Sequence, residues 1–521
     1  MYRDDPKQTE FLDFYMPFGG KLSTGNRWVK LAAMIPWGDI EEAYKNSLNG
    51  TGMGAPAKSG RIAFGALVIK ERLGVTDEET VEQILKNPYL QYFLGLHEFR
   101  EKALFDPSMM VHFRSRFGQK DYDAINTKII DLATGVTLDE PSQTTSEDPG
   151  KGAIQIESDD DEEPPADPPN EGKLLMDATC TPADITYPTD LKLLNEAREK
   201  TEEYIDTLHA AFIGERKKPR TYRRKARRQF LAIIKQKKPG AKKICKAIGQ
   251  QLRFIKRNLA YIERYLEQDR KALVSLSSYN IKCLQVIHTL YGQQFFMYEN
   301  RTHSVADRIV SISQPHVRPI VRGKAGKKVE FGAKISMSHV RGGYVSLHRL
   351  SWDAYNESGD LVSQIEAYRE RFGCYPASVH ADMFYRTRAN RAYCKNLDIR
   401  LTGPALGRPR KMTAENAAEL KAEKKLARQD ELDRIPVEGK FGNAKRKGTL
   451  DRIMAKLAHT SESVINIGLI VLNLDTWLRA VLLALHLGLE AHVLWLGRVL
   501  RAVWGSIFPN PSPMKMPHHQ T

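Results

Sequence analysis

The sequence predicts a mixed α/β protein in which an all-helical N-terminal domain precedes an α/β domain with a large helical insertion. Three observations lead to this fold class. Residues 1–135 contain helical patterns, short apolar strands alternate with helices from residue 173 onward, and residues 190–297 are almost wholly helical in pattern. A chain of 521 residues also exceeds the size of one ordinary core, which favours two or more domains.

Two adjacent helices are expected within the N-terminal domain. Residues 60–72 form an amphipathic pattern that ends near Gly74, and Thr76 with Glu79 forms a capping box for the next helix. That helix ends at the Asn87–Pro88 break. Its first two turns are rich in acids, which phosphates would repel. We therefore expect packing helices here and not a DNA-reading helix-turn-helix, and leave DNA contacts elsewhere in the domain open.

A linker is expected over residues 136–172. Between Asp139 and Glu171 there are twelve acidic residues, one lysine and six prolines. A segment with so few apolar residues and so high a net charge does not bury enough surface to fold. The sequence therefore predicts disorder here.

The domain over residues 173–460 contains a regular order of elements once the helical insertion at about 190–300 is set aside. The expected strands cover 173–179, 329–340, 344–350, a segment ending at Asp382, and 399–402, and the expected helices cover 360–372, 387–396 and a long segment around Glu438. This order, a hairpin beside the first strand followed by strand–helix units, is that of the ribonuclease H-like fold. It makes the first and fourth strands neighbours in one sheet.

The positive charge is concentrated in the insertion. The chain has a net charge of +16, and residues 216–257 alone contain eighteen Lys and Arg and no Asp or Glu. The alternative is a solvated surface, but acids would then be expected nearby to balance it. A phosphate-binding arm without sequence specificity is favoured. The cations assigned to it are Arg223, Arg224, Lys225, Arg227 and Arg228.

Three carboxylates are the candidate catalytic residues. Asp177 is the only acid in the first strand, Asp382 closes the fourth strand, and Glu438 lies on the last long helix. Carboxylates on neighbouring strand ends and a facing helix can hold two divalent ions for phosphodiester chemistry. Each acid alone has a simpler explanation, a turn former for the aspartates and an exposed pair with Lys445 for the glutamate. The three together, in this order, predict a metal site.

Residues 434–450, RIPVEGKFGNAKRKGTL, resemble the C-terminal signature of insertion-sequence transposases of the insertion-sequence-five group. Arg434, Glu438 and Lys445 fit the pattern Tyr-x2-Arg-x3-Glu-x6-Lys, whereas Glu431 stands at the tyrosine position. The segments LLMDATCTPADITYPTDLKLLNEAR and VHADMFYRTRANRAYCKNLDIRLTGPALGRP resemble the first- and second-aspartate regions. Residues 27–118 are similar to the N-terminal domain of such transposases.

The resemblance implies a DDE transposase. Asp177, Asp382 and Glu438 would bind two Mg²⁺ ions, with Mn²⁺ as an alternative, for DNA cleavage at transposon ends and transfer of the 3′-OH into target DNA. Arg434, Lys445 and Arg446 would hold phosphates. The implied partners are transposon-end and target DNA and further copies of the chain, as a homodimer or higher oligomer, with no membrane. The implied location is the cytoplasm of a bacterium or archaeon, at the nucleoid.

Two rival functions remain open: a transposase-derived, non-catalytic DNA-binding protein, and another ribonuclease H-like nuclease such as a resolvase. Within the catalytic assignment, four nearby acids are weaker candidates, and they are Asp184, Asp190, Glu431 and Asp433. Five scattered cysteines without a paired spacing indicate a reducing compartment.

Apolar C-terminal helices and a frayed tail are expected over residues 461–521. Charged residues interrupt the apolar stretch at 464–505, so its longest uncharged run is shorter than a membrane span needs. We therefore expect helices that are buried or that pack against a partner.

Overall fold

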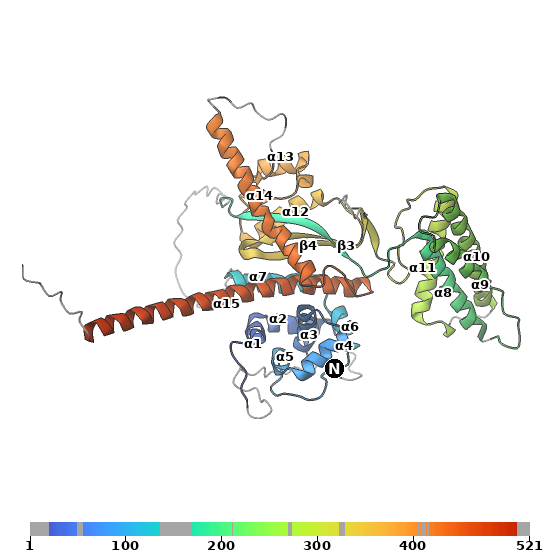
Figure 1. Ribbon diagram of the computed structural model, residues 1–521, viewed down its shortest axis with the longest axis horizontal. Coiled ribbons are helices and arrows are strands. Elements are labelled where there is room, and N and C mark those ends of the chain that lie inside the picture. Colours follow the sequence, from blue (N-terminus) through green and yellow to red (C-terminus); the bar gives the residue numbers. More distant parts are fainter. Residues whose placement is uncertain are drawn as a thin grey trace, which may run out of the picture.

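The computed structural model describes residues 20–48, 56–135, 168–210, 212–268, 274–321, 329–404, 407, 413 and 416–507. Residues 136–167 of the acidic linker predicted at 136–172 lie outside the described residues, and so does the tail from residue 508. Figure 1 shows three bodies: the N-terminal helices, a sheet covered by helices, and a helical bundle to one side.

The N-terminal body is all-helical, as predicted. Its helices are α1 (Arg27–Met34), α2 (Trp37–Asn46), α3 (Gly60–Leu73), α4 (Asp77–Lys86), α5 (Pro88–Phe93), α6 (Met109–Arg116) and α7 (Gln119–Thr134). Helix α3 ends at Gly74 in the left-handed conformation, and the Thr76 side chain caps α4 by accepting from the Glu79 backbone N–H. Asp77 of α4 pairs with Lys70 and Arg114. The acidic start of α4 is thus partly used in internal packing, which agrees with the expectation of packing helices.

A six-stranded mixed sheet lies at the centre of the molecule. Its strands are β1 (Lys173–Pro182), β2 (Arg318–Val321), β3 (Val329–Val340), β4 (Tyr344–Ser351), β5 (Ser378–His380) and β6 (Arg400–Leu401). The order is β2-β3-β1-β5-β6, with β4 also paired to β3. Strand β1 is antiparallel to β3 and parallel to β5, so the predicted first and fourth strands are neighbours. Only β2 was not expected from the sequence.

Helices cover both faces of the sheet, and the alternation of β1 decides which residues face which helices. Leu174 and Met176 pack in a cluster with α12 (Asp360–Phe372) and α13 (Arg388–Asn396), whereas Leu175 packs with α14 (Ala417–Arg446). Successive strand residues point to opposite faces. Asp177 therefore shares the face of Leu175 and points toward α14.

The insertion is helical and has a core of its own. It consists of α8 (Asp190–Ala210), α9 (Arg223–Ile234), α10 (Ala241–Gln268) and α11 (Ser278–Glu299). Buried apolar residues at helical spacing, among them Leu194, Ile205, Ile255 and Ile287, form a cluster separate from those of the sheet. Figure 1 shows this bundle standing beside the sheet.

The C-terminal region forms one helix, α15 (Ala458–Ile507), instead of the several that were predicted. One of its faces packs in the N-terminal core and another packs under the sheet. Helix α15 runs between these two bodies (Figure 1). The segment Ala458–Leu487 has the length and apolarity of a membrane span, with a mean hydropathy of 1.7, but half of its most apolar window is buried inside the protein.

Candidate active site

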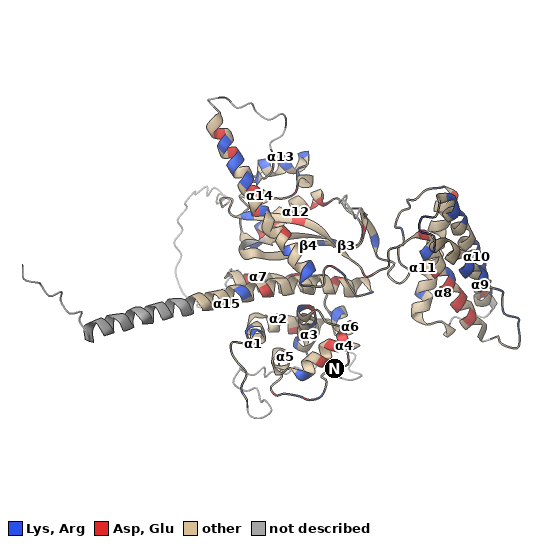
Figure 2. Ribbon diagram, viewed as in Figure 1, with Lys and Arg blue, Asp and Glu red and all other residues tan. Residues whose placement is uncertain are grey.

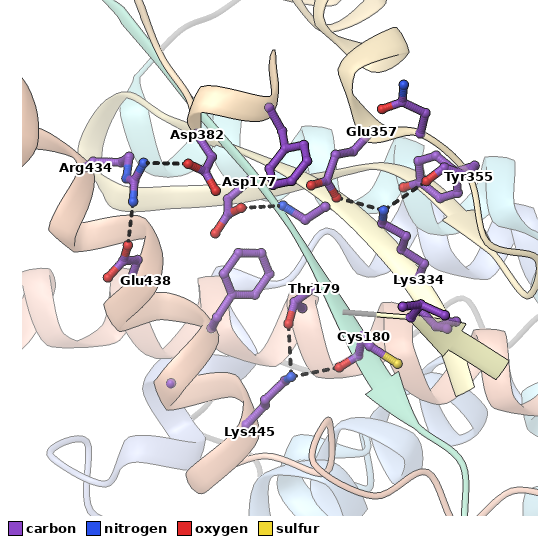
Figure 3. A pocket seen from close by; sticks show the side chains of 17 residues that line it. Asp177, Thr179, Cys180, Lys334, Tyr355, Glu357, Asp382, Arg434, Glu438 and Lys445 are labelled. Atoms are coloured by element: carbon purple, nitrogen blue, oxygen red, sulfur yellow. Dashed lines mark hydrogen bonds and ion pairs between the residues drawn. The ribbon is translucent and has the colours of Figure 1, made fainter. Parts of the chain in front are cut away.

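A cavity of about 770 Å³ opens between the sheet and α14, and it contains all three predicted catalytic carboxylates (Figure 3). Its charged and polar side chains come from β1, β3, the turns that follow β4 and β5, and α14. They are Asp177, Thr179, Lys334, Tyr355, Asn356, Glu357, Asp382, Arg434, Glu438 and Lys445. Asp177 and Asp382 are 205 positions apart in sequence, and Asp382 and Glu438 are 56 positions apart. The fold brings all three to one cavity.

Asp177 lies in the middle of β1 and not near its end, because the strand continues to Pro182. Its Oδ1 accepts a hydrogen bond from the Ala178 N–H at 2.8 Å. Burial raises the pKa of Asp177 to about 6, and the negative charges of Glu357 and Asp382 add to this shift. The largest cause of the raised pKa is thus loss of hydration and not repulsion between the two aspartates.

Asp382 follows β5 and caps the short 3-10 turn Met383–Tyr385, accepting from the Met383 N–H at 2.6 Å. The last paired residues of the two parallel strands are Leu175 and His380. Asp177 and Asp382 each lie two residues beyond that pair. Neighbouring strands are separated by about 4.8 Å, so this register places the two aspartates side by side.

Arg434 of α14 joins the second aspartate to the glutamate. Its Nη1 lies 3.6 Å from Asp382 Oδ1 and its Nη2 lies 3.0 Å from Glu438 Oε1 (Figure 3). All three side chains are partly exposed, at 36%, 47% and 58% for Arg434, Asp382 and Glu438. Pro436, midway between Arg434 and Glu438 on the helix, has no N–H to continue the helical hydrogen bonding. The guanidinium thus stands where two carboxylates need a cation.

Lys445 lines the cavity, but Arg446 does not. The Lys445 Nζ donates to Thr179 Oγ1 at 3.0 Å and to the Cys180 carbonyl at 2.7 Å, so it holds α14 against β1. The Arg446 Nε donates back to the Gly442 carbonyl of its own helix at 3.3 Å. The phosphate role predicted for Arg446 is therefore not supported by its position.

Sequence reasoning missed four residues at this site. Glu357 and Lys334 form an ion pair of 2.8 Å at the wall of the cavity, and Tyr355 lies beside them with its ring 4.8 Å from the Lys334 Nζ. Tyr385 is fully buried near Asp177 and Glu357. Tyr355, Glu357 and Tyr385 lie in a loop or in the short turn after Asp382, neither of which carries a periodic pattern. Lys334 lies within β3, where the alternation of the strand does not distinguish it from the other polar residues. A sequence alone offers no signal for them beyond the proximity of Tyr385 to Asp382.

The four weaker candidates lie outside this cavity. Asp184 pairs with Arg452 and Lys456 at a different pocket. Asp190 pairs with Arg308, Asp433 pairs with Lys173, and Glu431 is exposed on α14. None of the four lines the cavity that contains Asp177.

A second group of potential metal ligands is formed by His380, Asp430 and Asp433, whose donor atoms lie within 4.8 Å of one another. Its acids already have cationic partners: Arg400 binds Asp430 through two contacts of 2.6 and 3.0 Å, and Lys173 binds Asp433 at 2.5 Å. Burial lowers the pKa of His380, which favours the neutral ring. This network joins α14 to β1, β5 and β6, so we interpret it as structural.

The predicted basic arm is exposed. Arg224, Lys225, Arg227 and Arg228 of α9 are exposed to solvent, whereas Arg223 is tied to Asp206 by contacts of 2.8 and 2.9 Å. Figure 2 shows Lys and Arg along α9 and α10, with Asp and Glu on α8. The acids of α8 therefore balance only part of this charge.

Comparison with known proteins gives two family matches. Residues 17–116 match the family model described as Transposase domain (DUF772), and residues 379–475 match the one described as Transposase DDE domain. The second match contains Asp382 and Glu438, whereas Asp177 lies outside both. The chain is also 28% identical over 169 residues to the uncharacterized protein ORF8 in the nfe locus of Rhizobium meliloti, covering 32% of this chain and 68% of that protein. No solved structure matches it.

Both family matches are to transposase domains, and they cover the N-terminal body up to α6 and the C-terminal part of the α/β body that carries Asp382 and Glu438. In these two regions the chain is thus similar to DNA transposases. Together the two matches agree with a transposase of the insertion-sequence type.

Proposed function

We propose that this protein is a DDE transposase that cleaves DNA at transposon ends and transfers the freed 3′-OH into target DNA, with Asp177, Asp382 and Glu438 as its catalytic carboxylates. One observation carries the proposal: three acids from three separate elements line the same cavity, in the order and on the elements expected of this chemistry. The strand order with β1 between β3 and β5 supports a ribonuclease H-like fold for the domain at 173–460.

The residues present fit divalent cations with a preference for oxygen ligands. Asp177 has a raised pKa, so its charge is poorly compensated in the metal-free protein. Asp382 and Glu438 share Arg434 as a counter-ion. Mg²⁺ or Mn²⁺ suits such a set of carboxylates. Two bound ions would activate the attacking oxygen and stabilise the leaving oxygen.

The other residues have separate tasks in this proposal. Lys445 and Arg434 place positive charge at the cavity and would contact phosphates beside the scissile bond. The cations of α9 would hold DNA outside the cavity without selecting a sequence. DNA bound to both would extend from the sheet to the helical bundle, which lie side by side (Figure 1). A homodimer or higher oligomer would bring two transposon ends together.

The test uses the full-length protein, Mg²⁺ and labelled duplexes made from the DNA that flanks the coding sequence. Asp177→Asn, Asp382→Asn and Glu438→Gln should each abolish cleavage while DNA binding is retained. Glu431→Gln is the matched control, because Glu431 is an exposed acid on the same helix, seven residues before Glu438. Cleavage that survives any one of the three substitutions would remove that residue from the site. A wild-type protein that binds these duplexes but never cuts them would instead favour the non-catalytic alternative.

A further inference from the structure

Glu357 is a fourth carboxylate in the cavity, and it comes from an element that the triad does not use. It begins the 3-10 turn Glu357–Gly359, which connects the strand β4 to α12. In Figure 3, Asp177 lies between Glu357 on one side and Arg434 with Glu438 on the other. The cavity therefore has acids on both sides of Asp177.

The loop that presents Glu357 is held by hydrogen bonds within the loop and from the helix α13. The Asn356 side chain accepts from the Ser358 N–H at 3.1 Å and so caps the turn. The buried Asn390 of α13 donates to the Ser358 carbonyl at 2.7 Å and to the Tyr385 carbonyl at 2.8 Å. Tyr385 belongs to the turn that Asp382 caps. One side chain thus ties the Glu357 turn to the Asp382 turn, and the two acids are positioned together.

Lys334 orients Glu357. Its Nζ lies 2.8 Å from Glu357 Oε2 and donates to the Tyr355 carbonyl at 2.9 Å. The lysine itself is mostly buried, with 16% of its side chain exposed, and it comes from β3, next to β1. Glu357 is close enough to Asp177 for its charge to act on that aspartate. The fully buried Tyr385 hydroxyl, which makes no hydrogen bond of regular geometry to the described residues, lies near both acids.

We infer that Glu357 is a fourth carboxylate of the metal centre and faces the bound cations from the side of Asp177 opposite Glu438. This inference rests on the proposed function. The charges that line the cavity support it: the three acids of the triad share the cavity with three cations, Lys334, Arg434 and Lys445, and Glu357 is the carboxylate that makes this lining negative overall. The rival explanation is a structural ion pair with Lys334 that has no part in metal binding.

The experiment is a titration of the full-length protein with Mn²⁺, with free Mn²⁺ followed by electron paramagnetic resonance and no DNA present. Glu357→Gln should weaken Mn²⁺ binding roughly tenfold, because affinity in such sites follows the number of charged oxygen ligands. Lys334→Met removes the same ion pair but keeps the carboxylate, so it should bind Mn²⁺ at least as well as the wild type. Glu370→Gln, an exposed acid near the other end of α12, controls for the loss of one negative charge. Thermal unfolding of each variant reports on the fold.

The outcomes separate the inference from the proposed function. Weaker binding in Glu357→Gln alone supports the inference. Unchanged binding in Glu357→Gln, together with lost binding in Asp177→Asn, overturns the role of Glu357 and leaves the triad intact. Equal weakening in Glu357→Gln and Lys334→Met, with equal loss of thermal stability, shows that the ion pair is structural and also overturns the inference. Unchanged binding in Asp177→Asn overturns the metal site itself.

Discussion

The exposed cations of α9 give a prediction whose size follows from the structure. Four of them, Arg224, Lys225, Arg227 and Arg228, are exposed and make no ion pair with any residue that the structure describes, whereas Arg223 is held by Asp206. Each phosphate neutralised by a cation changes the slope of log affinity against log salt concentration by about 0.9 for duplex DNA. Replacing all four with glutamine should therefore reduce the slope by about 3 to 4 if all four contact phosphates.

The assay is fluorescence anisotropy of a labelled duplex of arbitrary sequence, measured over a range of salt concentrations. A control variant carries glutamine at four exposed cations of the N-terminal body, and these are Arg100, Lys102, Lys120 and Lys128. An unchanged slope in the α9 variant would refute the idea that α9 holds DNA. An equal decrease in both variants would show that charge in general matters and that the α9 surface has no special role.

Three further changes should have measurable effects. Arg434→Ala should tighten Mn²⁺ binding to the DNA-free protein by roughly fivefold or less, since exposed ion pairs contribute at most about 1 kcal/mol. DNA cleavage by the same variant should fall. Weaker Mn²⁺ binding would show that the guanidinium does not compete with the cation. Asp177 has a pKa of about 6 and must be ionised to bind metal, so Mn²⁺ binding should release about half a proton at pH 6 and almost none at pH 8. Proton release is measured by calorimetry in two buffers with different ionisation enthalpies. Equal release at both pH values would contradict the prediction. The same pKa lies above the unfolded value near 3.9, so without metal the contribution of Asp177 to stability decreases as pH rises from about 4 to 6. Asn473→Leu removes three hydrogen bonds of 2.8 Å, to the Val345 N–H, to the Val345 carbonyl and to the Asn126 side chain. The free energy of unfolding in urea should therefore decrease by roughly 2–4 kcal/mol. An unchanged value would mean that these groups find other partners.

The sequence predicted the regular elements well where apolar periodicity was strong. The helix at 360–372 and the strand at 329–340 have the same bounds in the structure, and the first and fourth strands are neighbours. Strand β2 was missed because it has only four residues, one of them Pro319, and lies at an edge of the sheet. Several C-terminal helices were predicted because the apolar pattern does not indicate how far one helix continues.

The site was predictable only as far as individual residues carry a pattern. Asp177, Asp382 and Glu438 were found because strand order and spacing place them, and the structure brings them to one cavity. Glu357 was missed because it lies in a loop whose path depends on tertiary contacts such as the Asn390 hydrogen bonds. Adjacent helical residues point about 100° apart, so Lys445 lines the cavity and Arg446 does not, and a phosphate contact by Arg446 stays a prediction.

Helix α15 also determines when the protein can fold during synthesis. The N-terminal core contains Ile467, Ile470 and Leu474 from this helix, and the core under the sheet contains Ile465 and Leu469 from the same helix. At about 5–20 residues per second, a ribosome that has passed residue 135 needs roughly 20–70 s more to reach this region. Through that interval the N-terminal body lacks one wall of its core, and the α/β body cannot complete its own core before the interval ends. A nascent chain interrupted before residue 460 therefore has neither core complete, and the carboxylates are assembled on a finished scaffold only after residues 465–478 have been translated.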